Sequence, residues 1–178
     1  MTFEEKTISS RLVYEGPVFK LRQHEVECYG GRISKRDIVE HSGGSIIVAV
    51  TDEGKILAER QFRKAFEKVL LELPAGKADP GEDPETTAVR ELAEETGYTA
   101  GSVKHLVSYS PTCGYSTELL HIFICRDLKA GETNWDPTEC IELCEYDADE
   151  LIDMIMRGEV RDSKTIIGLL FARQAGEI

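Results

Sequence analysis

Features that mark several other classes of protein are absent from this chain of 178 residues. No apolar run approaches the roughly 20 residues of a membrane-spanning helix, and neither a low-complexity tract nor a fixed internal repeat is present. Positive charge is scarce, because 21 Lys and Arg stand against 33 Asp and Glu, for a net charge of −12. Such an acidic chain is not suited to nucleic acid or to anionic membranes. We therefore expect no nucleic-acid partner and no membrane partner.

The cysteines form no recognisable framework. They are odd in number and none stands in a Cys-x-x-Cys pair; the five are Cys28, Cys113, Cys125, Cys140 and Cys144. The first residues, MTFEEKTISS, do not form a secretory signal. Scattered cysteines without a signal are typical of a reducing compartment, so we expect a cytoplasmic protein.

Length and composition fit one domain with a small extension. A chain of this length with 41% hydrophobic residues can bury a sizeable core. Residues 1–10 are polar, and we expect them to be loosely ordered. Between 11 and 40, short apolar stretches lie on either side of Gly30-Gly31. This pattern predicts an N-terminal β-hairpin.

The rest of the chain mixes strand and helix patterns. Short apolar runs predict strands over 45–50, 55–61, 103–109, 118–125 and 141–146. Helical spacing of apolar residues predicts two closing helices over 149–157 and 163–174. The pattern alone supports an α/β or α+β class.

One stretch, GKADPGEDPETTAVRELAEETGY from Gly76, carries six acidic residues after a turn at Pro80-Gly81. Asp83 can cap a helix, and Pro84 suits its first position. Gly97 suits a left-handed stop. These signals predict a helix over 84–96.

This helix should separate apolar from charged side chains. An apolar stripe is expected from Ala88, Val89, Leu92, Ala93 and Thr96, with Arg90, Glu91, Glu94 and Glu95 on the opposite side. Like charges one turn apart destabilise a helix, so the clustered glutamates call for a further reason. Carboxylate oxygens suit Mg²⁺ or Mn²⁺, which can bridge substrate phosphates. The alternative is a solvated acidic face.

The spacing favours the metal. Gly76, Glu82, Arg90-Glu91-Leu92, Glu94-Glu95 and Gly97 resemble the Nudix box in every polar position; Tyr98 departs, where an aliphatic residue is usual. The resemblance implies a Nudix hydrolase that cleaves a diphosphate linked to another moiety, with a mixed sheet in an α/β/α sandwich. It also implies a Nudix domain over 43–178 and an N-terminal β region over 1–42 that forms a homodimer.

Four further stretches resemble the ADP-ribose pyrophosphatase branch: RDIVEHSGG, QFRKAFEKVLLELPAGK, GYSTELLHIFI and DSKTIIGLL. The substrate implied is a small nucleoside diphosphate sugar such as ADP-ribose, cleaved to AMP and ribose 5-phosphate. Cys113 stands where that branch carries a proline. Therefore GDP- and UDP-sugars, nucleoside triphosphates and a role as a non-catalytic sensor stay open.

The resemblance also implies site residues. Glu91, Glu95 and the backbone carbonyl of Ala75 are expected to bind Mg²⁺, or Mn²⁺ in its place. Arg63 and Glu72 are expected to contact substrate, although Arg63 could be a surface side chain and Glu72 could pair with a neighbour. Arg36 is expected to reach the diphosphate, in some members from the other subunit, and could equally be a solvated strand residue.

The resemblance further implies a general base in an acidic loop after the box, which here is 136–142 and reads DPTECIE. Asp136 and Glu139 are the acids that remain where the branch carries its acidic run. Glu139 is chosen as the base and as a further metal ligand, with Glu94 and Glu118 as the fallback bases. The alternative is an acidic loop without a catalytic role. Arg90 and Glu94 are included among the catalytic residues, with Glu94 either a metal ligand or the i,i+4 partner of Arg90.

Overall fold

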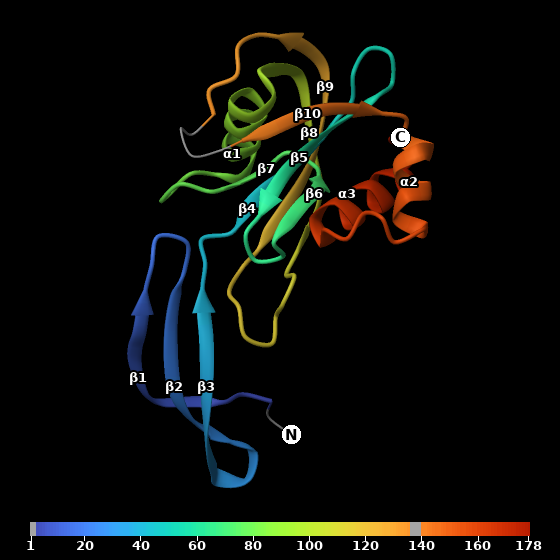
Figure 1. Ribbon diagram of the computed structural model, residues 1–178. Coiled ribbons are helices and arrows are strands. Elements are labelled where there is room, and N and C mark those ends of the chain that lie inside the picture. The colour runs from blue at the N-terminus through green and yellow to red at the C-terminus, as the bar shows by residue number, and fades with distance from the viewer. Residues whose placement is uncertain (1–2, 136–139) are drawn as a thin grey trace. The chain divides into compact units, whose positions relative to one another are not determined.

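The computed structural model describes residues 3–135 and 140–178. Contacts divide the chain into two compact units (Figure 1). Unit 1 comprises Met1–Gly43 and Ser110–Leu119, and unit 2 comprises Gly44–Tyr109 and Leu120–Ile178. The division of the chain into domains at 42/43 stays a prediction.

Unit 1 is built on an antiparallel sheet in the order β1-β2-β3. Its strands are β1 (Lys6–Glu15), β2 (Lys20–Cys28) and β3 (Arg32–Glu40). The predicted hairpin at Gly30-Gly31 is present as β2 and β3, joined by the short 3₁₀ turn η1 (Tyr29–Gly31). The expectation of a loose N-terminus is wrong for residues 6–10, because β1 pairs along β2 and satisfies their backbone groups.

The loop of unit 1 that comes from later in the chain pairs with β3. The N–H of Val39 donates to the carbonyl of Tyr115 at 2.8 Å, and the N–H of Thr117 donates to the carbonyl of Val39 at 2.9 Å. Residues 110–119 therefore meet β3 at one isolated parallel bridge, although in sequence they lie between two strands of unit 2.

Unit 2 contains a four-stranded sheet, β7-β4-β9-β8, and a three-stranded sheet, β10-β5-β6. The first combines a parallel β4–β9 pair with antiparallel neighbours. Its strands are β4 (Gly44–Ala49), β7 (Ala75–Lys77), β8 (Tyr98–Tyr109) and β9 (Leu120–Ala130). The second consists of β5 (Ile56–Arg63), β6 (Lys68–Glu72) and β10 (Ile141–Tyr146).

Helices cover both faces of the mixed sheet (Figure 1). Ile47 of β4 packs in one core with residues of α1 (Pro84–Glu91), while Ile46 packs in the other with α2 (Ala148–Met156) and α3 (Ser163–Gln174). Because neighbouring residues of a strand face opposite sides, β4 is buried along its whole length. The predicted α/β/α sandwich with a mixed sheet is confirmed.

The predicted helix over 84–96, called the box helix below, consists of α1 and the turn η2 (Leu92–Thr96) and has the expected ends. The side chain of Asp83 accepts hydrogen bonds from the N–H groups of Glu85 and Thr86, and Gly97 ends the helix with a φ of 75°. The last turn, η2 (Leu92–Thr96), is π-helical rather than α-helical, a form often found at functional sites. None of the helices in 3–135 and 140–178 is long and apolar enough to cross a bilayer.

Candidate active site

The box helix packs against β7 at Gly76, which has no side chain. A Cβ added at Gly76 would fall 1.8 Å from the carboxyl carbon of Glu91, so only glycine lets that carboxyl approach the strand. In the next turn, Oε2 of Glu95 accepts a hydrogen bond of 2.9 Å from the N–H of Ala75. The structure therefore brings together the three described residues predicted to hold a metal.

This packing corrects the predicted division of the helix into faces. Glu95 is not on an exposed polar side but is buried, at 6% exposure, whereas Val89 of the predicted apolar stripe is 39% exposed. The reason is β7, which the sequence patterns did not predict and which covers the side of the helix that carries Glu91 and Glu95.

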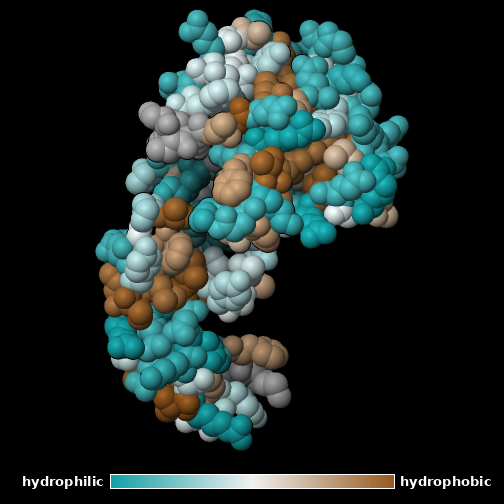
Figure 2. Space-filling view, in the orientation of Figure 1, coloured by the Kyte–Doolittle hydropathy of each residue, from teal (hydrophilic) through white to brown (hydrophobic). Residues whose placement is uncertain are grey.

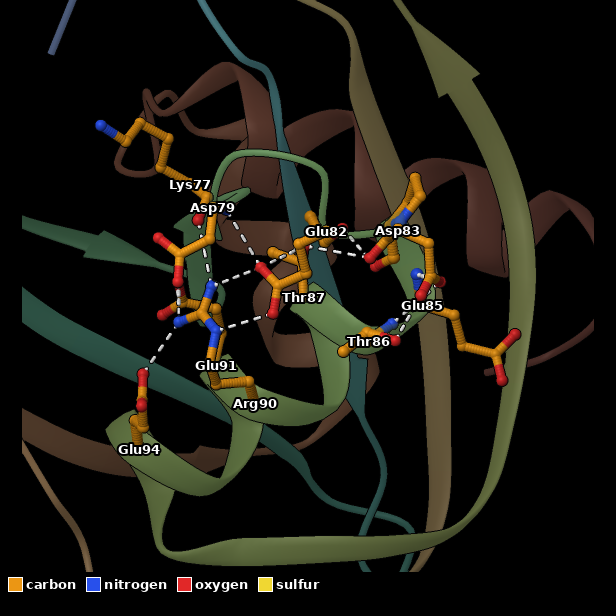
Figure 3. Close-up of polar contacts among 12 residues, drawn as sticks. Lys77, Asp79, Glu82, Asp83, Glu85, Thr86, Thr87, Arg90, Glu91 and Glu94 are labelled. Atoms are coloured by element: carbon orange, nitrogen blue, oxygen red, sulfur yellow. Dashed lines mark hydrogen bonds and ion pairs between the residues drawn. The ribbon is translucent and has the colours of Figure 1, made fainter.

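Arg90 holds three carboxylates of this segment (Figure 3). Its Nε and Nη2 donate to the two oxygens of Glu82, both at 3.0 Å. Its Nη1 donates to Glu91 at 2.8 Å and to Glu94 at 2.9 Å. The carboxylates, that of Glu82 foremost, raise the pKa of Arg90 above its ordinary value. One guanidinium thus offsets the repulsion that clustered glutamates would otherwise cause.

Glu82 orders the loop that precedes the helix. Its Oε2 accepts from the N–H of Asp79 at 3.1 Å and from Oγ1 of Thr87 at 2.9 Å. Hydrogen bonds from Arg90 first, and then from the backbone of Asp79, lower the pKa of the Glu82 carboxyl to about 2. The Glu82 carboxyl therefore keeps its charge to a lower pH than an ordinary glutamate does.

The donor set suits a hard divalent cation. Carboxylate and carbonyl oxygens are the ligands of Mg²⁺, which is usually bound by one or two carboxylates together with substrate phosphates and water. Within 3–135 and 140–178, no three acidic, histidine or cysteine side chains are placed to hold a metal by themselves. Glu91 and Glu95 supply two carboxylates, and Glu139, the third carboxylate predicted as a ligand, lies outside the described residues.

A second charged cluster joins β5, β6 and the start of α3. Arg63 forms a bidentate pair with Glu72, with Nε and Nη2 each 2.8 Å from a carboxylate oxygen. Glu72 is only 1% exposed, and Nζ of Lys164 lies 3.2 Å from its Oε2. The structure brings the two predicted substrate contacts together, and Glu72 does pair with its neighbour.

The sequence patterns missed Lys164. It stands in DSKTIIGLL, which supported the family resemblance without any residue being assigned a role. Burial disfavours its charge, but Asp162 and Glu72 outweigh that effect and raise the pKa of its ammonium group. Asp162 also caps α3 by accepting from the N–H of Thr165 at 2.9 Å. The cap thus fixes the start of the helix that carries Lys164.

Two other predicted residues lie in unit 1. Arg36 of β3 pairs with Glu5, its Nε 2.9 Å and its Nη2 2.5 Å from the carboxylate oxygens. The hydrogen bonds between them lower the pKa of the Glu5 carboxyl and raise the pKa of the Arg36 guanidinium. Glu118, a fallback base, lies 3.8 Å from Nδ1 of His41. Their roles in catalysis stay predictions.

Comparison with known proteins agrees with this geometry. The model of the NUDIX domain matches residues 41–167. The chain belongs to the Nudix family. The predicted Nudix hydrolase is therefore confirmed at the level of family and enzyme class.

Three curated relatives cover most of this Nudix chain. A methanol dehydrogenase activator of Bacillus methanolicus is 40% identical over 95% of this chain and 92% of its own. An ADP-ribose pyrophosphatase of Bacillus subtilis is 39% identical over 96% and 93%. A GDP-mannose pyrophosphatase of Shigella flexneri is 31% identical over 79% and 78%. The predicted resemblance to the ADP-ribose pyrophosphatase branch is confirmed.

A solved structure supports the fold. An ADP compounds hydrolase superposes with a TM-score of 0.86 over 98% of this chain and 97% of its own, at 20% sequence identity. At that identity the likeness concerns the fold alone.

The low pKa of Glu82 predicts a specific acid sensitivity. Its pKa is about 2 in the folded protein against an ordinary 4.5, so its stabilisation is present above pH 4.5 and is lost as the pH falls through 2. Between these values the melting temperature of the wild type should fall more steeply than that of Glu82→Gln. Calorimetric melting at a series of pH values checks this, and equal slopes would contradict the assignment.

Proposed function

We propose that this Nudix protein hydrolyses the diphosphate linkage of a nucleoside diphosphate sugar, most readily ADP-ribose, with bound Mg²⁺ or Mn²⁺. The products are AMP and ribose 5-phosphate. The relatives named for ADP-ribose and GDP-mannose support the substrate class. The observation that carries the proposal is the convergence of Ala75, Glu91 and Glu95 across Gly76.

The metal would be held by Glu91, Glu95 and the carbonyl of Ala75. When bound, it supplies positive charge next to the diphosphate, which an acidic chain otherwise lacks. Arg90 keeps the carboxylates of Glu91 and Glu94 in fixed positions through its two hydrogen bonds from Nη1. The chain thus contributes a set of oxygen ligands whose repulsion is already offset.

Arg63 contributes a second positive group. Glu72 occupies the Nε and Nη2 edge of the guanidinium, which leaves the opposite edge, at Nη1, to face a phosphate. Because Glu72 is buried and held by Lys164 as well, the plane of the guanidinium is fixed. A planar, oriented guanidinium suits bidentate contact with phosphate oxygens.

In the reaction, water attacks one phosphorus and the bond from that phosphorus to the bridging oxygen breaks. Glu139 accepts the proton of the water, and the bridging oxygen leaves with the other phosphate. A carboxylate with an ordinary pKa can assist because water near a bound cation is more acidic than bulk water.

Release of phosphomonoester from a panel of nucleotides tests the activity and the metal site together. ADP-ribose should give the highest kcat/KM and should require Mg²⁺ or Mn²⁺. Glu95→Gln should lower kcat by about 100-fold or more, because a metal ligand is lost, while the amide oxygen can still accept from Ala75. Glu85→Gln, an exposed acid on the same helix, is the matched control and should keep the wild-type rate.

Each alternative gives a different result in this panel. Cleavage of GDP- or UDP-sugars in preference to ADP-ribose would change the substrate, and cleavage of triphosphates alone would change the reaction. Binding of a nucleotide sugar without any turnover would favour a sensor. A wild-type rate in Glu95→Gln at limiting Mg²⁺ would contradict the metal assignment.

The choice of Glu139 as the base has its own test. Glu139→Gln should lower kcat by about 100-fold or more with little change in KM, since general base catalysis typically contributes that much. Glu94→Gln removes a carboxylate that binds Arg90 and should cost less. Steady-state kinetics of both variants decides. Near-normal kcat in Glu139→Gln with a large loss in Glu94→Gln would place the base in the box helix.

We also propose a homodimer formed through unit 1, in which Arg36 serves the partner's site. Hydrophobic surface is visible over the β1–β3 sheet (Figure 2), and exposed residues of this unit include Leu12, Val13, Tyr14, Val18 and Phe19. Apolar side chains that gather on an exposed surface mark an interaction site. A second copy would cover it.

Sedimentation at micromolar concentration should give the mass of two chains. Leu12→Asp should shift the protein towards monomer and lower its activity, because a charge in an apolar contact is costly. A fully active wild-type monomer would contradict the proposal.

A further inference from the structure

At the C-terminal end of the box helix, some backbone carbonyls accept hydrogen bonds from residues outside the helix. The carbonyl of Leu92 accepts from Oγ1 of Thr96 at 2.5 Å, and that of Ala93 accepts from the N–H of Gly97 at 3.0 Å. Helix ends leave their last carbonyls without partners within the helix. For the next two carbonyls, those of Glu94 and Glu95, the partners come from a segment about 40 residues later in the chain.

That segment, 131–135, follows β9 and supplies two donors of different kinds. The backbone N–H of Asn134 donates to the carbonyl of Glu94 at 2.9 Å. The indole Nε1–H of Trp135 donates to the carbonyl of Glu95 at 2.7 Å.

Two glycines let the segment lie this close. The N–H of Gly131 donates to the carbonyl of Gly97 at 2.6 Å. A Cβ on Gly97 would lie 3.2 Å from backbone atoms of Glu132 and Thr133, and its φ of 75° disfavours a side chain in any case. The close approach of the segment to the helix end therefore depends on glycine at positions 97 and 131.

Glu95 is consequently held at two points. Its carboxylate accepts from the N–H of Ala75 on β7, and its carbonyl accepts from Trp135. A ligand that is fixed at both the side chain and the main chain has little freedom to change its distance from a bound ion. Trp135 is also the last described residue before 136–139, which includes Glu139 in the sequence.

We infer that Trp135 is a positioning residue for the metal site: its indole N–H fixes the backbone of Glu95 and so the place of the Glu95 carboxylate. The inference rests on the proposed function. Hydrogen-bond partners of metal ligands typically account for 10- to 100-fold in metal affinity or activity. Loss of the indole N–H should therefore weaken metal binding, although Trp135 touches neither metal nor substrate.

The chain provides its own reporter for this contact, because Trp135 is its single tryptophan. Titration of the wild-type protein with Mg²⁺, without nucleotide, should change the tryptophan emission in a saturable manner. The change should disappear in Glu95→Gln, which lacks the ligand. Emission that stays constant while Mn²⁺ binding is detected by electron paramagnetic resonance would overturn the inference.

Trp135→Phe keeps an aromatic ring but removes the N–H, together with the five-membered ring that carries it. Its dissociation constant for Mn²⁺, measured by the same resonance method, should rise about tenfold, and kcat at subsaturating metal should fall accordingly. Asn134→Ala is the matched control, because the contact made by Asn134 uses the backbone N–H. Its affinity for Mn²⁺ should equal that of the wild type.

The outcomes separate this inference from the proposed function. Wild-type Mn²⁺ affinity in Trp135→Phe would overturn the positioning role and leave the activity standing. Equal losses in Trp135→Phe and Asn134→Ala would show a general effect of the segment and would also overturn it. Absence of saturable Mn²⁺ binding by the wild type, also with AMP present to supply a phosphate, would refute the metal site itself, and the inference with it.

Discussion

Contact between the carboxyl of Glu91 and the backbone of Gly76 is the constraint on which the site depends. Any side chain at position 76 would occupy the space of that carboxyl. Because the contact fixes the helix against β7, it also places Glu95 within hydrogen-bond distance of Ala75. A short strand and one turn of helix thereby become a single oxygen-lined surface, supported by the β4 strand with which β7 pairs.

Charged side chains form two clusters, one around Arg90 and one around Glu72, and the clusters differ in their balance of charge. Around Arg90, one cation holds three carboxylates, and the balance stays negative, as a cation site requires. Around Glu72, two cations share one buried carboxylate, and Lys164 also pairs with Asp162, so that cations and carboxylates are equal in number. An acidic protein can attract an anionic substrate only through such local departures from its net charge of −12.

Prediction from the sequence succeeded where the signals are local. The start and end of the box helix follow from Asp83, Pro84 and Gly97, whose effects act within a few residues. The strands β6 and β7 were not predicted, because they are short and lack a clear apolar period. The burial of Glu95 could not be foreseen without β7. Lys164 was missed for a related reason: its partner Glu72 is 92 residues away in the sequence, and no local pattern records such a pair.

The pairing of residues 110–119 with β3 has a topological consequence. The chain passes between the two units at 43/44, at 109/110 and again at 119/120. Gly44, Tyr109 and Leu120 are also register partners in neighbouring strands of the mixed sheet. The three chain segments that connect the units therefore start at neighbouring positions of that sheet. No single cut in the chain can separate the units, and removal of 1–43 would strip Tyr115 and Thr117 of their backbone partners on Val39. The N-terminal sheet thus shares backbone hydrogen bonds with residues 110–119, which lie between two strands of unit 2 in the sequence.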